Sequence, residues 1–184
     1  CAPLFHYPQS RVDSGLDFSS RYSQAVRIRQ RKDKRRKHSY VRNLAQRIMA
    51  QYGKASYWDE RYTKDPEPFD WYQRYSGVKD LIAQYVKKTD HVLNIGCGNS
   101  RLSEDMYDDG FSTIANIDIS KVCVDQMIEK YRDKTGLSWQ QMNCTALEFP
   151  DEAFDAVVDK GTLDSILCGE GSTSNVGKAL SEIT

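Results

Sequence analysis

The sequence predicts an α/β protein with a doubly wound, mostly parallel sheet, and three observations support this fold class. Short apolar runs alternate with segments of helical spacing from about residue 78 to the end of the chain, which is typical of βαβ units. The run "HVLNI" at 91–95 passes directly into the tight turn Gly-Cys-Gly. With 184 residues, 39% of them hydrophobic, the chain has the apolar content of one ordinary domain.

The first predicted elements are a helix at 78–88, a strand at 91–95 and a helix at 101–110. Helical spacing within 78–88 predicts one apolar face, made of Leu81, Ile82, Tyr85 and Val86. The continuous apolar run at 91–95 indicates a buried strand. Gly110 follows the helical segment "RLSEDMYDDG" and is the expected C-terminal stop.

The second half of the chain repeats this alternation. "TIANIDIS" at 113–120 predicts a strand, and Ser120 is the expected N-cap of a helix at 121–134. The apolar face of that helix is predicted to be Val124, Met127, Ile128 and Tyr131. Further strands are expected at 137–143 and 154–159, and further helices begin at "TLDSIL" (162–167) and "SNVGKALSEI" (174–183).

Charge is distributed unevenly along a chain whose formal net charge is +0. Residues 1–56 hold 13 Lys and Arg against 3 Asp and Glu, whereas the remaining residues hold 13 against 23. Residues 1–48 are therefore predicted to be a basic extension, disordered or a solvated helix, ahead of a domain at 49–184. Met49 is the first methionine and a candidate native start. The basic run at 27–37 is interpreted as a solvated tail rather than a nucleic-acid-binding arm, because few aromatic residues interleave with it.

Composition also argues against several classes of protein. The five cysteines contain no CxxC pair and the three histidines have no ligand spacing, so a zinc site is not expected. No run approaches the ~18 apolar residues of a membrane span, and the N-terminal residues lack the apolar segment of a signal peptide. A soluble, cytoplasmic protein without a membrane partner is expected.

The Gly-Cys-Gly turn predicts a nucleotide site. Gly96 allows a tight exit from the strand, and Gly98 leaves the backbone bare where a ligand can approach. Asp118 ends the second strand 20 residues after Gly98, the spacing of a carboxylate that binds ribose hydroxyls. A dinucleotide fingerprint requires a third glycine where this chain has Arg101, which disfavours a nicotinamide oxidoreductase. S-adenosyl-L-methionine, which has a ribose but no pyrophosphate, fits better.

Several strings resemble a known family. "VLNIGCGNSRLSEDMYDDGF", "IANIDIS", "FPDEAFDAVVDKGTLDSI", "YWDERY" and "PFDWY" are similar to the seven-strand (class I) S-adenosylmethionine-dependent methyltransferases, in particular the methyltransferase-like 13 and elongation factor 1-alpha lysine methyltransferase group. The resemblance runs from about Tyr57 to Ile183. It implies a Rossmann-like sheet with strand order 3-2-1-4-5-7-6, of which this chain supplies the 3-2-1-4 half.

The resemblance also implies which residues contact the cofactor. They are Trp58, Tyr62, Trp71, Gly96, Gly98, Asp118, Ile119, Asn143, Cys144 and Lys160. Aromatic faces attract a sulfonium as they attract other cations. Asn143 departs from the family, which has an aspartate there; an amide oxygen can still accept from an adenine amino group, without charge assistance.

The implied activity is protein-lysine N-methylation of a substrate such as elongation factor 1-alpha. Asp159 and Lys160, after the fourth predicted strand, are the candidate catalytic residues, although an Asp-Lys pair at this position is equally typical of a surface ion pair. The alternatives are a non-catalytic cofactor-binding or interaction module, or a small-molecule methyltransferase.

The end of the sequence leads to a further expectation. Relatives continue beyond "ALSEIT" into a fifth strand, so we expect the chain to be a partial, C-terminally truncated domain that is poorly soluble and inactive alone. The strand at 154–159 is then expected to be an unpaired edge.

Overall fold

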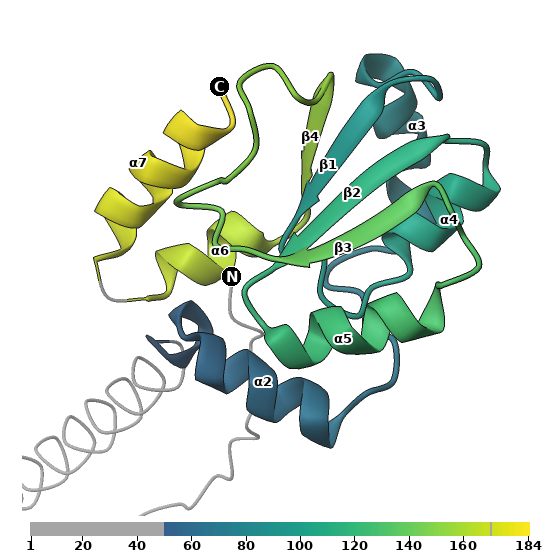
Figure 1. The fold of residues 1–184 in the computed structure, drawn as a ribbon. Coiled ribbons are helices and arrows are strands. Elements are labelled where there is room, and N and C mark those ends of the chain that lie inside the picture. Colours follow the sequence, from purple (N-terminus) through teal and green to yellow (C-terminus); the bar gives the residue numbers. More distant parts are fainter. Residues whose placement is uncertain (1–49, 170) are drawn as a thin grey trace, which may run out of the picture. The chain divides into compact units, whose positions relative to one another are not determined.

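A computed structural model describes residues 50–169 and 171–184, which form a four-stranded sheet and seven helical segments (Figure 1). In chain order these are η1 (Ala50–Gly53), α2 (Ala55–Lys64), α3 (Tyr75–Tyr85), β1 (His91–Ile95), α4 (Leu102–Asp108), β2 (Thr113–Asp118), α5 (Lys121–Lys130), β3 (Leu137–Gln141), β4 (Ala156–Asp159), α6 (Thr162–Leu167) and α7 (Ser172–Glu182). The predicted basic extension at 1–48, the run at 27–37 and Met49 lie outside the described residues.

The sheet has the predicted order, β3-β2-β1-β4, and every pair within it is parallel. Ile95 of β1 lies opposite Ile117 of β2 and Asp159 of β4. The three strands therefore end level with one another. The segments that follow them, beginning at Gly96, Ile119 and Lys160, emerge at the same edge of the sheet, where ligands bind in doubly wound folds.

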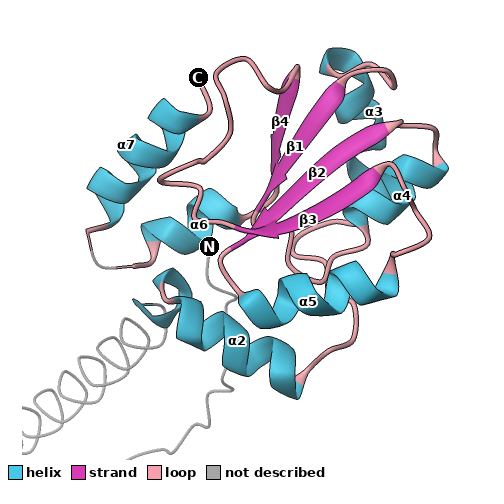
Figure 2. Cartoon of the chain, in the orientation of Figure 1, coloured by secondary structure: helices cyan, strands magenta, loops and turns pink. Residues whose placement is uncertain are grey.

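Side chains alternate between two apolar layers, one on each face of the sheet. Val92 and Ile114 pack on the face covered by α3, α4 and α5, whereas Leu93 and Ile117 pack on the face that receives Ala179 of α7. Figure 2 shows these two sets of helices on either side of the strands. The α/β doubly wound prediction is therefore confirmed.

Two predicted helix faces are partly wrong. Leu81 and Tyr85 of α3 are 57% and 78% exposed, and Ile128 of α5 is 48% exposed. In α3 the residues that pack on the core are Tyr75, Val78 and Ile82, which share one helix face because they are three and four positions apart. The helix begins at Tyr75, three residues before the predicted segment. Helical spacing alone is compatible with burial of either of two neighbouring faces of α3. Packing against α4 and the sheet determines which of them is buried.

A buried polar cluster joins the sheet to α4. The Asn94 side-chain amide donates to Ser103 Oγ at 2.9 Å and to Asn116 Oδ1 at 3.1 Å, and Ser103 Oγ donates to the same Asn116 oxygen. Asn116 donates in turn to the Ser138 carbonyl of β3. Because these buried groups hydrogen-bond to one another, the bonds offset the cost of removing them from water, and the cluster fixes α4 against β1 and β2.

Asp109, at the end of α4, connects α4 to α3 and to the segment before β1. Its carboxylate accepts from Lys79 Nζ at 2.6 Å and from Tyr75 Oη at 2.9 Å, and Lys88 Nζ lies 3.2 Å away. Hydrogen bonds from Lys79, Tyr75 and Lys88 hold the pKa of Asp109 well below its ordinary value.

We expect Asp109→Asn to lower the thermal stability of the chain near neutral pH and to have a smaller effect in acid. A carboxyl whose pKa is lowered by folding stabilises the folded state fully above its unfolded pKa of about 3.9, and this contribution disappears as the pH falls towards the folded pKa. The difference between the melting temperatures of the two proteins, measured between pH 2 and 7, should therefore narrow progressively below about pH 4. Asp133→Asn, an exposed change of the same kind, is the control, and a constant Asp109→Asn deficit across this range would contradict the assignment.

Within the described ranges, no helix has both the length and the apolar character needed to cross a membrane.

Candidate functional site

A cavity opens at the edge of the sheet where the strands end, between the turn after β1, the ends of β2 and β3, helix α2 and the segment before α3. All ten residues predicted to contact a cofactor line it: Trp58, Tyr62, Trp71, Gly96, Gly98, Asp118, Ile119, Asn143, Cys144 and Lys160. Asp159, which was predicted beside Lys160, is not among the lining residues. The structure thus brings together residues that lie up to about a hundred positions apart in the sequence.

The Gly-Cys-Gly turn forms the floor of the cavity. Gly96 and Gly98 have φ angles of 57° and 54°, in the left-handed region that favours glycine. The Cys97 amide donates to the Ile117 carbonyl at 2.9 Å, which continues the β1–β2 ladder into the turn. A Cβ on Gly98 would lie 2.7 Å from the Tyr62 hydroxyl, so the turn is also packed closely against α2.

Asp118 is buried at the end of β2 and already holds the turn in place. Its carboxylate accepts from the Gly98 amide at 2.9 Å and from the Ser120 amide at 2.9 Å. Burial raises the pKa of Asp118, while the two amide hydrogen bonds oppose that shift. A carboxylate has about four acceptor sites, so Asp118 retains capacity to accept from a diol in the cavity.

Aromatic rings from α2 and η1 form one wall. Trp58 stacks on Tyr62 with ring centroids 5.8 Å apart and on Tyr52 at the same distance. The Trp58 indole nitrogen donates to the Tyr52 carbonyl at 2.8 Å. Tyr52 was not identified from the sequence, because no pattern linked it to the "YWDERY" string five residues later.

Asp59, also missed as a site residue, fixes this wall to the sheet. Asp59 Oδ1 accepts from the Ser120 hydroxyl at 2.6 Å, and Ser120 is the N-cap of α5, where its hydroxyl accepts from the Cys123 amide. The predicted N-cap is confirmed. In the sequence Asp59 lies between the predicted contact residues Trp58 and Tyr62, which could have identified it. Only the fold shows that its side chain contacts Ser120.

The segment after β3 forms the opposite side of the cavity. Asn143 Oδ1 accepts from the Thr145 amide and the Thr145 hydroxyl, both at 3.0 Å. The oxygen that was expected to accept from adenine thus accepts two hydrogen bonds within the turn. The NH₂ group of Asn143 remains as a possible donor to a ligand. Cys144 is buried beside it, and burial raises the pKa of its thiol to about 11.

Asp159 and Lys160 have different surroundings. Asp159 is exposed, and its Oδ1 accepts from the Thr162 and Leu163 amides at the start of α6. Lys160 lines the cavity and forms an ion pair with Asp70, with Nζ 3.2 Å from Oδ1. Lys160 thus faces the site, whereas Asp159 caps a helix beside it.

Arg61 is a second cation on the cavity lining. Its guanidinium lies 5.1 Å from the Phe69 ring centroid and 6.0 Å from that of Trp71. Arg61 belongs to the "YWDERY" string, but no role was predicted for it from the sequence.

A parallel sheet with a glycine turn after β1 and a buried acid after β2 defines a Rossmann-like nucleotide-binding domain. Comparison with known families makes this specific, because a family described as "Methyltransferase domain" matches residues 93–184. The chain belongs to this methyltransferase domain family.

Curated relatives are similar over the same region. The chain is 42% identical to the eEF1A lysine and N-terminal methyltransferase homolog of Drosophila melanogaster, over 70% of this chain and 19% of the relative. It is 39% identical to the eEF1A lysine and N-terminal methyltransferase of Mus musculus, over 77% of this chain and 21% of the relative. It is 38% identical to EEF1A lysine methyltransferase 4 of Mus musculus, over 68% of this chain and 50% of that protein. The chain therefore spans about a fifth of the first two relatives.

Proposed function

We propose that this chain binds S-adenosylmethionine and contributes to the methylation of lysine side chains in a protein substrate of the elongation factor 1A class, in the cytoplasm. The observation that carries the proposal is one cavity in which a buried carboxylate, a bare glycine backbone and an aromatic wall meet. The names of the relatives support the choice of substrate. Because this chain spans only part of each relative, the substrate is part of the proposal.

The lining residues fit the parts of this cofactor. Asp118 has remaining acceptor capacity for the ribose hydroxyls, and Gly96 and Gly98, which line the cavity, offer their backbone to the chain that bears the sulfur. The faces of Trp58 and Trp71 suit a sulfonium, an attraction worth roughly 0.5–2 kcal/mol. Arg61, whose guanidinium faces the cavity between two rings, suits the methionine carboxylate.

The cofactor supplies the activated methyl group, and the protein supplies position and a dry environment. A lysine acceptor has to be neutral to attack, although its reference pKa is about 10.4. Loss of water around the lysine as it enters the cavity disfavours the ammonium form. Lys160 is ion-paired with Asp70, so we assign it to charge balance and positioning in the cavity rather than to proton abstraction.

The test has two stages. Isothermal titration with S-adenosylhomocysteine and, separately, NAD is expected to show binding of the first alone. Transfer of a radiolabelled methyl group to purified elongation factor 1A is then followed by mass spectrometry, which locates the modified lysine; a substrate with that lysine changed to arginine is the control.

The outcomes separate the alternatives. Cofactor binding without transfer to any protein would support a non-catalytic module. Transfer confined to small molecules would support a small-molecule methyltransferase. Failure to bind S-adenosylhomocysteine would overturn the proposal.

A further inference from the structure

Residues 65–72, the first part of the segment between α2 and α3, border the cavity through Phe69 and Trp71 and are named the strap. Asn99, directly after the glycine turn, holds its backbone from the cavity side. The Asn99 side-chain amide donates to the Glu67 carbonyl at 2.6 Å, and Asn99 Oδ1 accepts from the Phe69 amide at 3.3 Å. The strap is thus attached to the same turn that forms the cavity floor.

The strap contributes two aromatic rings to the cavity. Phe69 and Trp71 meet edge to face with ring centroids 5.2 Å apart, and the Arg61 guanidinium lies against both. Both rings line the cavity and remain 44% and 39% exposed. They therefore lie at the border between the cavity and the surface.

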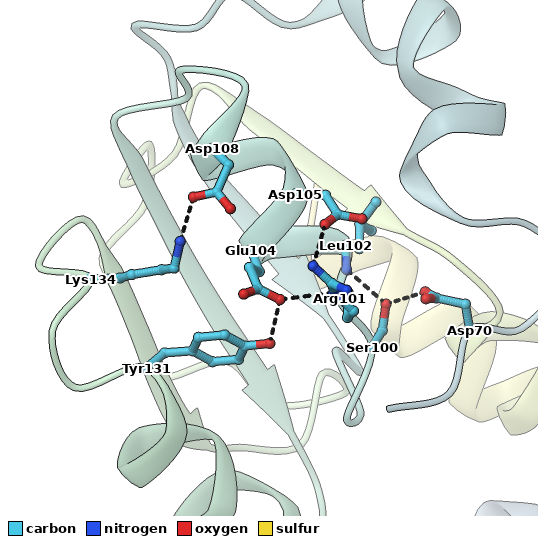
Figure 3. A network of polar contacts seen from close by, with 9 residues as sticks. All are labelled: Asp70, Ser100, Arg101, Leu102, Glu104, Asp105, Asp108, Tyr131 and Lys134. Carbon is cyan, nitrogen blue, oxygen red and sulfur yellow. Dashed lines mark hydrogen bonds and ion pairs between the residues drawn. The ribbon is translucent and has the colours of Figure 1, made fainter. Parts of the chain in front are cut away.

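Asp70, between these two rings, makes the polar contacts of the strap. Its carboxylate accepts from the Ser100 hydroxyl, and Ser100 Oγ itself accepts from the Leu102 amide at the start of α4 (Figure 3). The same oxygen, Asp70 Oδ1, lies 3.2 Å from Lys160 Nζ, which also donates to the Trp71 carbonyl at 3.1 Å. One carboxylate thus connects the strap to the start of α4 and to the end of β4.

The ion pair between Lys160 and Asp70 is largely shielded from solvent. The side chains of Lys160 and Asp70 are only 14% and 11% exposed, so salt screens their interaction weakly. Removing one partner of such a pair leaves the other charge poorly solvated, which is far more costly than losing a surface pair.

The strap also contains a residue with an unfavourable backbone conformation. Tyr72, at its end, has a φ of 63°, which is uncommon for a residue other than glycine. The Tyr72 hydroxyl donates to Asp164 at 3.0 Å, but Tyr72 is 74% exposed. Backbone strain of this kind persists only where the surroundings enforce it.

We infer that Asp70 is a positioning residue, which holds the strap and its two rings over the cavity by binding Lys160 and Ser100 together. The inference rests on the proposed function, because it assigns the covered cavity to S-adenosylmethionine. On this inference the cofactor dissociates more slowly while the Asp70–Lys160 pair holds the strap in place.

The first measurement needs no ligand. Hydrogen–deuterium exchange of the strap amides is compared in the wild type, Asp70→Asn and the control Glu67→Gln, which removes one negative charge from an exposed position of the same strap. Asparagine keeps an oxygen for Ser100 but loses the charge that binds Lys160. We expect exchange about tenfold faster or more in Asp70→Asn alone. Equal exchange in both variants would overturn the inference.

The second measurement is the dissociation rate of S-adenosylhomocysteine, followed by stopped-flow tryptophan fluorescence. It should rise about tenfold or more in Asp70→Asn, remain unchanged in Glu67→Gln, and return towards the wild-type rate in Asp70→Glu. If the wild type binds S-adenosylhomocysteine and Asp70→Asn releases it at the same rate, the positioning role is wrong but the proposed function is not. If the wild type does not bind it, the proposed function is wrong. If Asp70→Asn does not fold, Lys160→Gln breaks the same ion pair from the other side and should give the same faster strap exchange.

Discussion

Replacing Gly96 by alanine is expected to destabilise the domain by roughly 2–5 kcal/mol and to abolish measurable cofactor binding. The φ angle of 57° disfavours any side chain at this position. A Cβ would also lie 2.0 Å from Thr162 Oγ1 and 2.6 Å from Thr162 Cγ2. Thr162 has little freedom to move, because its hydroxyl donates to the Ile95 carbonyl at 2.9 Å.

Urea denaturation and isothermal titration with S-adenosylhomocysteine measure the two effects. Gly177→Ala is the matched control, since no atom lies within 4 Å of its added Cβ and the position is inside α7; it should leave stability unchanged or raise it by up to about 1 kcal/mol. Adding Thr162→Ala to Gly96→Ala should recover part of the loss by removing the two nearest atoms. A Gly96→Ala protein as stable as the wild type would show that the turn can change shape.

Asp118→Ala is expected to weaken S-adenosylmethionine binding by roughly 1.5–3 kcal/mol, the range for hydrogen bonds to a charged group. The same change leaves the Gly98 and Ser120 amides without their acceptor. Each buried amide without a partner costs about 1–3 kcal/mol, so the melting temperature should fall as well. Asp118→Asn keeps one acceptor oxygen and should lose less stability than Asp118→Ala.

The comparison of the two Asp118 variants separates cofactor binding from support of the turn. Asp125→Asn on α5 is the control, because its carboxylate pairs with Lys121 on the exposed surface, where such pairs contribute about 0–1 kcal/mol. Calorimetry that shows unchanged affinity for both Asp118 variants would remove Asp118 from the site.

Local patterns in the sequence were sufficient for the order and type of most elements. The apolar run at 91–95, the glycines after it and the Ser120 cap act over a few residues, and each appears in the structure as expected. Helix α2 was not predicted, although it carries Trp58 and Tyr62. Because most of its residues are polar, the sequence pattern does not reveal the face of α2 that packs on α5.

The sequence by itself determined the fold class, the strand order of the described sheet and ten of the residues that line the cavity, through glycines and a carboxylate at fixed spacing and through resemblance to a family. The tertiary structure decided which faces of α3 and α5 are buried, and how Asp59, Tyr52 and Asp70 take part. The contacts of Asp59 with Ser120 and of Asp70 with Lys160 join residues 61 and 90 positions apart. No local pattern encodes such pairs, because their partners become neighbours only after the parallel strands have aligned their ends.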